Sequence, residues 1–413
     1  MSLDQFFDNQ RLWQERITLG TGGTTHSFGD GWGSGDAWAG ASGTSLHLML
    51  GASGGSRAAE GVSTALAASL AAGITEAIVW ARRPDPGLDL ALLADGWRAG
   101  FEPWWMIADL TDLPDSPALP AGIEVRPGEA DDAAELVPDV PYAYADQLAL
   151  FASRPDGLEW WVATDGGRPI GHAVANLGLP HVDGGGSGLF NVGVHPSHRR
   201  RGIGLALTLA AMRSAQESGA RWMGLNSTGM GEHVYEQAGF RQIGVGQTWL
   251  RSSDRLTDNP PDEHRALVRA IGSGDLGAVK GEAPERFWCE LSGQQVAARF
   301  GQEEMLRHLV APTSRGGVGL VPDVVALWSA GLTDEATAVC ANPDARELVT
   351  QPWDGRPLHH ATAAGNEGLV RALLAHGADL AATDSHFGGT PLGWAIATGQ
   401  PGIAALIRAA GGR

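Results

Sequence analysis

The chain has 413 residues, a length that suits two or three domains, each with its own core. Its formal net charge of −18 argues against binding to nucleic acid or to an anionic membrane and favours cationic partners. The two cysteines, Cys289 and Cys340, follow no metal-binding or disulfide pattern, so we expect no metal. Residues 1–20 lack the apolar segment of a signal peptide, and no stretch approaches the ~18 apolar residues that cross a membrane, which predicts a cytoplasmic protein.

The first 118 residues predict a small lobe of strands and helices. The stretch 20–55 is rich in Gly, Ser and Thr, with Trp32 and Trp38 interspersed. Such a composition is typical of a mobile loop, and an aromatic wall for a bound molecule is the alternative. The elements expected in this lobe are strands at 46–50 and 76–80, a helix at 58–72 and a final strand within 101–110.

Residues 121–194 predict three strands with two helices among them, followed by a buried fourth strand. Apolar runs mark the strands, and apolar residues at helical spacing mark the helices. The expected strands are 122–127, 160–164, 169–177 and 189–194, and the expected helices are 130–137 and 142–153. This order indicates an α/β domain.

A run of three arginines and two glycines follows the fourth strand. The sequence Ser197-His-Arg-Arg-Arg-Gly-Ile-Gly204 lies between Pro196, where the strand has ended, and a predicted helix at 205–214. Backbone N–H groups at a helix N-terminus attract anions, glycines let a phosphate approach the backbone, and Arg199–Arg201 add formal charge. The run therefore predicts a binding site for an anion with two phosphates. Its spacing is neither that of the P-loop nor that of the dinucleotide fingerprint.

The segment after this helix completes a family pattern. A strand at 222–226, a short helix with Tyr235-Glu-Gln-Ala-Gly-Phe240 and a strand at 242–251 are expected. Arg199-x-x-Gly202-x-Gly204 resembles the acetyl-CoA motif Arg/Gln-x-x-Gly-x-Gly/Ala of the GNAT superfamily of N-acetyltransferases, which share this order of elements and a Tyr-x-x-x-Gly-Phe signature. The resemblance covers about residues 121–255. It implies the mixed-sheet GNAT fold, acetyl-CoA as co-substrate and N-acetyltransferase activity.

The resemblance also implies roles for individual residues. The backbone of Val192 and Val194 would pair with the pantetheine arm of acetyl-CoA like an added strand, because two strands of the GNAT sheet splay apart there. Asn226 would bond the pantetheine, and Tyr235 would donate a hydrogen bond to the departing thiolate. Since a phenol has a pKa near 10 and a thiol near 8.5, full proton transfer is uphill by roughly 2 kcal/mol, and Tyr235 is expected to stabilise charge. The pyrophosphate would lie on Arg199, Arg200, Arg201, Gly202, Ile203 and Gly204.

The general base is where the sequence departs from the GNAT pattern. Many members of the superfamily place a glutamate on the fourth strand, but Gly188–Val194 contains no carboxylate. An alkyl amine with a pKa near 10.4 is protonated at neutral pH, a deficit of roughly 4 kcal/mol that the site must offset. The candidates are His172, His181, Asp183 and a water held by Asn191. A histidine in an apolar strand, as His172 is, is more often structural, and His181-Val-Asp183 is more often a plain polar loop.

The first lobe carries a faint copy of the same pattern. Leu92-Leu-Ala-Asp-Gly-Trp97, followed by a predicted strand, resembles the segment that ends at Phe240, so the lobe resembles a degenerate second GNAT half. Its glycines at 51, 54 and 55 lack the arginine triplet, and Leu92 stands where Tyr235 would be. We therefore expect this half not to bind CoA.

Beyond residue 262 the predicted strands give way to helical pairs with regularly spaced glycines. Gly274, Gly301, Gly331, Gly365 and Gly399 are separated by 27, 30, 34 and 34 residues, a period typical of a solenoid. The unit that begins at Asp354-Gly-Arg-Pro-Leu-His-His-Ala361 resembles an ankyrin repeat, and Gly389-Thr-Pro-Leu-Gly-Trp-Ala395 begins the next. We expect about five repeats, of which the last two are clearest.

The ankyrin resemblance assigns structural roles. Pro357 and Pro391 are expected at the first position of a helix, and Gly365 and Gly377 in left-handed turns. His359 matches the structural histidine of the repeat, so no catalytic role is expected for it. Ankyrin repeats also imply a protein partner.

Along the chain, the sequence predicts a degenerate GNAT-like lobe at 1–118, a GNAT acetyltransferase domain at 121–255 and ankyrin repeats at 262–413. We expect direct transfer of acetyl to the amine of a cationic small molecule, a metabolite or an antibiotic, within a ternary complex. Two alternatives stay open. One is acetylation of lysines on a protein that the ankyrin array recruits, and the other is a non-catalytic CoA-binding interaction protein.

Overall fold

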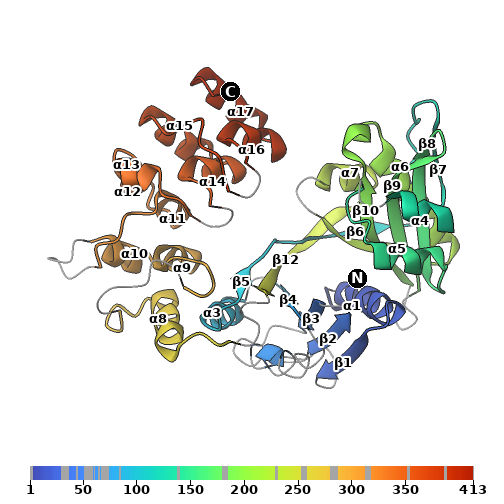
Figure 1. Ribbon diagram of the computed structural model, residues 1–413, viewed down its shortest axis with the longest axis horizontal. Coiled ribbons are helices and arrows are strands. Elements are labelled where there is room, and N and C mark those ends of the chain that lie inside the picture. Colours follow the sequence, from blue (N-terminus) through green and yellow to red (C-terminus); the bar gives the residue numbers. More distant parts are fainter. Residues whose placement is uncertain are drawn as a thin grey trace. The chain divides into compact units, whose positions relative to one another are not determined.

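The computed structural model describes the chain as two compact units (Figure 1). The first unit combines Met1–Asp85 with Gly100–Thr257, and the second combines Pro86–Ala99 with Asp258–Arg413. The described residues are 3–28, 37–42, 45–50, 59, 61–63, 66, 74–82, 85–136, 140–178, 185–227, 231–252, 258–279, 287–311, 318–350, 354–385 and 388–412. The three-part division predicted from the sequence stays a prediction.

The first unit is a mixed β-sheet covered by helices, as the sequence predicts. The order of its strands is β1-β2-β3-β4-β12-β6-β11-β10-β9-β8-β7. The strands are β1 (Thr24–Phe28), β2 (Ala37–Ser42), β3 (Ser45–Leu50), β4 (Glu76–Arg82), β6 (Trp104–Asp109), β7 (Ile123–Pro127), β8 (Leu158–Asp165), β9 (Arg168–Asn176), β10 (Gly186–Val194), β11 (Trp222–Ser227) and β12 (Arg241–Ser252). The helices are α1 (Leu3–Gly20), α4 (Ala130–Leu136), α5 (Ala145–Ala152), α6 (Ile203–Glu217) and α7 (Glu232–Gln237), with a 3₁₀ turn at Pro196–His198.

Two cores lie on opposite faces of this sheet. Neighbouring residues of β8, such as Val162 and Ala163, belong to different cores because successive side chains of a strand point to opposite faces. On one face α6 packs against small and aliphatic side chains. On the other face α1, α4 and α5 supply an aromatic core in which Trp13 and Phe190 stack with ring centroids 4.1 Å apart. This alternation is the physical source of the strand pattern in the sequence.

The predicted elements of 121–255 are present, with bounds that differ by up to three residues. Helix α5 begins at Ala145, three residues after the predicted start at 142. Tyr142 has a φ of 63°, and Tyr144 is extended, so neither can continue a helix. Of the predicted helix at 58–72, only residues 59, 61–63 and 66 are described, and these are helical.

A strand from the first 118 residues completes the sheet of the predicted acetyltransferase domain. Strand β6 lies between β11 and β12 and pairs antiparallel with both. Strand β12 continues past it to pair antiparallel with β4, which in turn pairs parallel with β3. Strands from the first 118 residues and from residues 121–255 therefore form one continuous sheet.

The second unit consists of helices. These are α3 (Pro86–Ala94), α8 (Asp262–Ser273), α9 (Gly293–Arg299), α10 (Glu303–Val310), α11 (Val324–Ser329), α12 (Thr333–Val339), α13 (Pro343–Arg346), α14 (Pro357–Ala363), α15 (Glu367–Ala375), α16 (Pro391–Ala397) and α17 (Pro401–Ala409). Helices pair as α9 with α10, α11 with α12, α14 with α15 and α16 with α17, and α3 packs against α8.

The spaced glycines serve one purpose. Gly274, Gly301, Gly331, Gly365 and Gly399 all have a φ between 65° and 85°, the left-handed region that glycine adopts without strain. Each lies within two residues of the end of a helix, namely α8, α9, α11, α14 or α16. The left-handed turns predicted at Gly365 and Gly377 are confirmed, with φ values of 67° and 79°. The number of complete repeats stays a prediction.

His359 has the structural role that the sequence predicts. Its Nδ1 accepts a hydrogen bond from the backbone N–H of Arg356 at 3.2 Å, so its Nε2 donates to the carbonyl of Gly389 at 3.1 Å. The ring is buried, and burial lowers the pKa of His359. A neutral histidine thus joins the starts of two successive repeats. Pro357 and Pro391 occupy the first turn of α14 and α16, as predicted.

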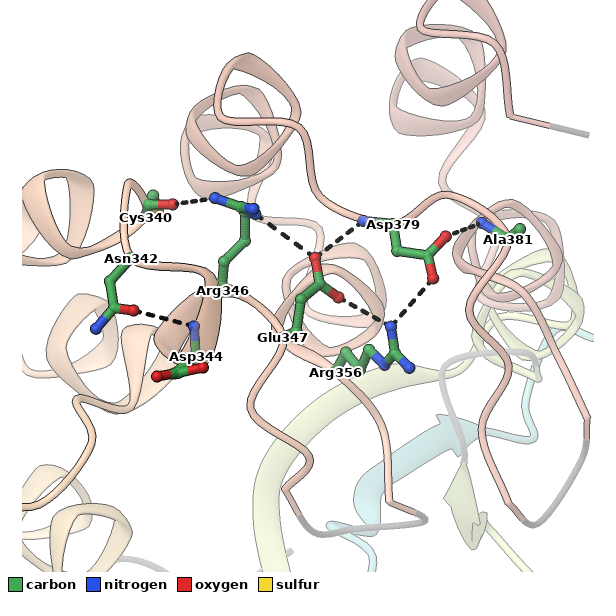
Figure 2. A network of polar contacts seen from close by, with 8 residues as sticks. All are labelled: Cys340, Asn342, Asp344, Arg346, Glu347, Arg356, Asp379 and Ala381. Carbon is green, nitrogen blue, oxygen red and sulfur yellow. Dashed lines mark hydrogen bonds and ion pairs between the residues drawn. The ribbon is translucent and has the colours of Figure 1, made fainter.

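A polar network joins the turns between neighbouring repeats of the second unit (Figure 2). The carboxylate of Glu347 lies 3.0 Å from Arg356 and 3.6 Å from Arg346, and it accepts a hydrogen bond from the backbone N–H of Asp379 at 3.0 Å. Arg356 also reaches the carboxylate of Asp379 at 3.1 Å. The charged groups of this cluster pair with one another within the repeats, which favours a structural role for the cluster.

The N-terminal copy is visible in local geometry. At the end of α3, Gly96 has a φ of 84° and the backbone N–H of Trp97 donates to the carbonyl of Leu92 at 2.9 Å. At the end of α7, Gly239 has a φ of 93° and Phe240 makes the same bond to Tyr235, also at 2.9 Å. The two helix ends that the sequence pattern equates therefore have the same conformation.

Candidate acetyl-CoA site

Strands β10 and β11 pair over only part of their length. Their parallel register joins Gly186–Gly188 to Trp222–Gly224 and goes no further. On its other side β10 stays paired with β9 as far as Val194. Within the described residues, the later part of β10 therefore turns an unpaired edge toward β11, and Val192 and Val194 lie on this part. Unpaired backbone groups of this kind need a hydrogen-bonding partner.

A bulge accompanies the separation of the two strands. The register of β10 against β9 shifts between Phe190 and Gly193, and Asn191 has a φ of 51° within the shift. The side-chain Nδ2 of Asn191 donates to Oε1 of Gln147 at 2.8 Å. A bulge redirects a strand and leaves its extra residue unpaired, which here opens the edge that carries Val192.

The Arg/Gly run forms a tight turn onto α6. Arg200 and Gly202 both have positive φ values, 65° and 78°, and Gly202 is the N-cap of α6 without a side-chain cap. The first N–H groups of α6, at Ile203 and Gly204, thus point away from the helix with no side chain to accept from them. Arg199, Arg200 and Arg201 are exposed, and the Nε of Arg199 donates to the carbonyl of Val194 at 3.1 Å. The turn combines free donors with positive charge.

Tyr235 lies close to this turn. A Cβ on Gly204 would meet Val234 at 3.8 Å and Val194 at 3.9 Å, so α7 packs beside the start of α6 and the end of β10. The ring of Tyr235 packs edge-on against Phe240 with centroids 5.9 Å apart. Burial, and then the charge of Tyr142 when it is ionised, raise the pKa of Tyr235. The phenol therefore stays protonated and available as a donor at physiological pH.

Asn226 occupies the facing strand, β11. Its Oδ1 is buried and has no hydrogen-bond partner among the described residues. A buried amide oxygen without a partner is costly, and a bound molecule with N–H groups would satisfy it. Contacts thus join the end of β10, the start of α6 and helix α7, and Asn226 lies on β11, the strand next to β10 in the sheet.

The candidates for the general base differ in what the structure describes. His181 and Asp183 lie outside the described residues. His172 is 0% exposed, and burial lowers its pKa to about 4. The amide of Asn191 is held by Gln147. These facts give His172 the character of a structural histidine and leave the base among the other candidates.

Sequence reasoning missed the loop before α5. Pro141 lies against β10 at Gly193, and Tyr142 follows it with a left-handed backbone. A tyrosine between a proline and an alanine carries no signal for a positive φ, so the sequence predicted a helix there. The conformation of this loop depends on the contact of Pro141 with Gly193, which is distant in the sequence.

Within the described ranges, His, Cys, Asp and Glu side chains form no group of three or more that could hold a metal ion. None of the helices in the described part of the chain has the length and apolar character needed to cross a bilayer.

Solved structures with a similar arrangement include N-acetyltransferases. A GCN5-related N-acetyltransferase from Kribbella flavida is 18% identical, with a TM-score of 0.46 over 62% of this chain and 98% of that one. One from Sphaerobacter thermophilus is 17% identical, with a TM-score of 0.40 over 52% and 76%. A tandem GNAT protein from the clavulanic acid biosynthesis pathway is 14% identical, with a TM-score of 0.41 over 60% and 94%. No curated protein sequence matches the chain.

Two family profiles match separate parts of the sequence. The profile of the acetyltransferase (GNAT) family matches residues 124–240, which span the strands, the Arg/Gly turn and Tyr235. The profile of ankyrin repeats matches residues 358–407, which contain α15 and α16. The chain therefore carries an acyltransferase domain of the GNAT family and, toward its C-terminus, ankyrin repeats.

Proposed function

We propose that this protein transfers acetyl directly from acetyl-CoA to an amine of a cationic small molecule. The observation that carries the proposal is the separation of β10 from β11 beside the uncapped start of α6. An extended, amide-containing arm fits the open strand edge, and a pyrophosphate fits the N–H groups and arginines of the adjoining turn. The open strand edge adjoins this turn in the protein, just as the pantetheine arm adjoins the pyrophosphate in CoA.

The chain divides the binding of acetyl-CoA among a few residues. The backbone of Val192 and Val194 pairs with the pantetheine amides, and the orphaned Oδ1 of Asn226 accepts a hydrogen bond from the same arm. The backbone N–H groups of Gly202, Ile203 and Gly204, with the side chains of Arg199, Arg200 and Arg201, hold the pyrophosphate. Acetyl-CoA supplies a thioester whose carbonyl carbon accepts a nucleophile.

The chemistry of the step is a direct displacement. The lone pair of the neutral amine attacks the thioester carbonyl, a C–N bond forms, and the C–S bond breaks. The amine loses one proton to a base or to solvent, and the thiolate that leaves gains one. Tyr235 donates a hydrogen bond to the sulfur as its negative charge develops, and its raised pKa keeps the donor proton in place. Binding both substrates together supplies the proximity that the reaction needs.

The charge of the chain supports a cationic acceptor. A net charge of −18 raises the local concentration of cations near the protein and speeds their encounter with it. Acetyl transfer only to neutral or anionic amines would contradict this part of the proposal.

The first test is titration of acetyl-CoA into the full chain by calorimetry. We expect the double variant Arg199→Ala/Arg200→Ala to raise the Kd about tenfold or more, because two charge-assisted contacts to phosphate are lost. Arg408→Ala, at an exposed arginine of α17, is the matched control and should bind as the wild type does. Thiol release with a panel of amines then identifies acceptors. Failure of the wild type to bind acetyl-CoA would refute the proposal.

A second function has one observation in its favour. The match of residues 358–407 to ankyrin repeats suits recruitment of a protein whose lysines are then acetylated. Mass spectrometry of proteins captured by the full chain in the presence of acetyl-CoA separates the two. Acetyl-lysine on a captured protein, with no turnover of small amines, would favour the protein substrate.

A further inference from the structure

A cavity of about 550 Å³ lies on the α6 face of the sheet, beside its edge strand β7. Ile123 and Val125 of β7 and Trp161 of β8 line it, and all three pack against the core that α6 covers. Ala206 and Ala210 of α6 also line it. The described residues that line this cavity include none of those proposed to hold acetyl-CoA. It is therefore a separate candidate site.

The segment between β6 and β7 forms a further wall of the cavity, to which it contributes Pro117. Two side chains of α6 hold this segment. Gln216 donates a hydrogen bond to the carbonyl of Thr111 at 3.2 Å. Arg213 donates to the carbonyl of Pro114 at 2.8 Å. The wall is thus fastened to the helix on which another part of the cavity is built.

Arg213 also brings a positive charge to the cavity that it lines. Besides its bond to Pro114, it donates from Nη1 to Oγ of Ser116 at 2.5 Å. Both acceptors are neutral, and within the described residues no carboxylate lies in ion-pair range of Arg213. A guanidinium group has five N–H donors, so three of them remain for a ligand. A carboxylate is the ligand group that such a cation binds most strongly.

Negative charge lies one helical turn further along α6. Glu217 lines the cavity four residues after Arg213, a spacing that places two side chains on the same face of a helix. Ser214, which lines the cavity as well, donates through Oγ to the carboxylate of Glu159 on β8. Glu124 lies between two residues of β7 that face α6, so its own side chain points to the opposite face of the sheet. A cationic group therefore fits beside Glu217, next to the place for a carboxylate.

Trp161 gives the cavity an aromatic wall. Its Nε1 is buried and has no hydrogen-bond partner among the residues that the structure describes. A buried indole N–H without an acceptor costs free energy, and an oxygen atom brought into the cavity would offset that cost. Aromatic rings pack favourably on one another, and the volume of the cavity is in the range that small molecules occupy. These walls suit a flat apolar group attached to an oxygen-bearing end.

We propose that this cavity binds a zwitterionic aromatic amino acid. The ring of the ligand lies on Trp161 and the aliphatic walls, its carboxylate lies on Arg213, and its ammonium group lies beside Glu217. Both charges are needed because the cavity presents a cation and an anion on one face of α6. The site goes beyond the proposed acetyl transfer, since it requires neither acetyl-CoA nor an acceptor amine.

Matched ligands test the proposal by calorimetric titration into the full chain without acetyl-CoA. L-Phenylalanine, 2-phenylethylamine and 3-phenylpropanoate share the ring and its two-carbon chain and differ in their charged groups. We expect L-phenylalanine to bind at least about tenfold more tightly than either of the other two, because each of these lacks one charge-assisted contact. Equal affinities, or no binding of L-phenylalanine up to about 10 mM, would overturn the inference.

Variants assign the binding to the cavity. Ala210→Leu fills part of it without touching the bonds of Arg213, and it should weaken L-phenylalanine binding about tenfold while the urea midpoint stays near that of the wild type. Arg213→Gln should abolish the advantage of L-phenylalanine over 2-phenylethylamine, and Glu217→Gln its advantage over 3-phenylpropanoate. Arg221→Gln, at an exposed arginine that does not line the cavity, is the control and should bind as the wild type does.

An affinity for L-phenylalanine that is unchanged in Ala210→Leu would place the ligand elsewhere, the acceptor site included, and would overturn the inference. The titrations contain no acetyl-CoA, so their outcome does not depend on the proposed function. Failure of acetyl-CoA to bind in the separate titration would refute the acetyl transfer and leave the amino-acid site standing.

Discussion

At the scale of single residues, Gly202 and Gly204 lie two positions apart but meet different demands. Gly202 has a φ of 78°, whereas Gly204 is outside the left-handed region. A Cβ on Gly204 would make ordinary contacts, at 3.8 Å and 3.9 Å. Only the first glycine is therefore required by the backbone itself. This difference agrees with the Gly-x-Gly/Ala form of the motif.

The two glycines form a matched pair of variants. We expect Gly202→Ala to lower the free energy of unfolding by about 1–2 kcal/mol, because a Cβ disfavours the left-handed conformation, and to weaken acetyl-CoA binding about tenfold. Gly204→Ala should fold with wild-type stability and bind within about threefold of wild type. Urea unfolding and calorimetry measure both quantities. Equal losses in the two variants would show that the turn conformation is not the cause.

His172 predicts a pH dependence of stability. Its pKa is about 4 in the folded chain and near 6.5 when unfolded, so the unfolded chain binds a proton that the native chain excludes. Stability from this group is complete above pH 6.5 and is lost as the pH falls toward 4, by about 3 kcal/mol in total. His172→Gln should flatten the decline in the urea midpoint over this range.

The control for this measurement is an exposed histidine. His233→Gln, on α7, replaces an exposed histidine with the same residue. Its urea midpoints should follow the wild-type pH profile. A wild-type slope that persists in His172→Gln would assign the pH dependence to other groups.

At the scale of elements, α3 belongs to the ankyrin-containing unit although it lies in the first hundred residues. Its Asp89 forms an ion pair with Arg299 of α9 at 3.0 Å, and the side chain of Asp89 is 9% exposed. Leu92 and Trp97 are each 1% exposed. Helix α3 is thus a buried packing element of the second unit, and an apolar leucine at position 92 suits that burial.

The ion pair gives a test of this packing. Asp89→Asn leaves Arg299 without its charged partner in a largely buried place, and we expect a loss of about 2 kcal/mol in the stability of the second unit. Glu367→Gln breaks an exposed pair with Arg371 on one helix and should change stability by less than about 0.5 kcal/mol. Thermal unfolding compares the two. An equally small effect of both would mean that α3 contributes little through this contact.

Elements differed in how well the sequence predicts them. The apolar patterns of β8, β9 and α6 arise from local alternation and helical spacing, so their existence could be predicted. The start of α5 could not, because the backbone of Tyr142 is set by contacts with strands distant in the sequence. The insertion of β6 between β11 and β12 likewise depends on pairing between distant segments, which periodicity does not report.

At the scale of the whole molecule, the motifs were predictable and their surroundings were not. The Arg/Gly turn and the glycine period are short patterns with fixed backbone demands, so their residues could be named from the sequence. The contact of Pro141 with Gly193 joins a loop to a strand about fifty residues later, and no spacing in the sequence relates the two. The residues that surround the motifs could therefore be identified only from the structure.

Because residues 86–99 belong to the second unit, no single cut in the chain separates the two units completely. The chain passes between the two units three times, at residues 85–86, 99–100 and 257–258. A single protease cut near residue 257 would leave the units joined through both ends of α3. During synthesis, α3 leaves the ribosome long before its partner α8 exists. The second unit is thus not released whole by cutting one linker, because its α3 lies within the part of the chain that otherwise forms the first unit.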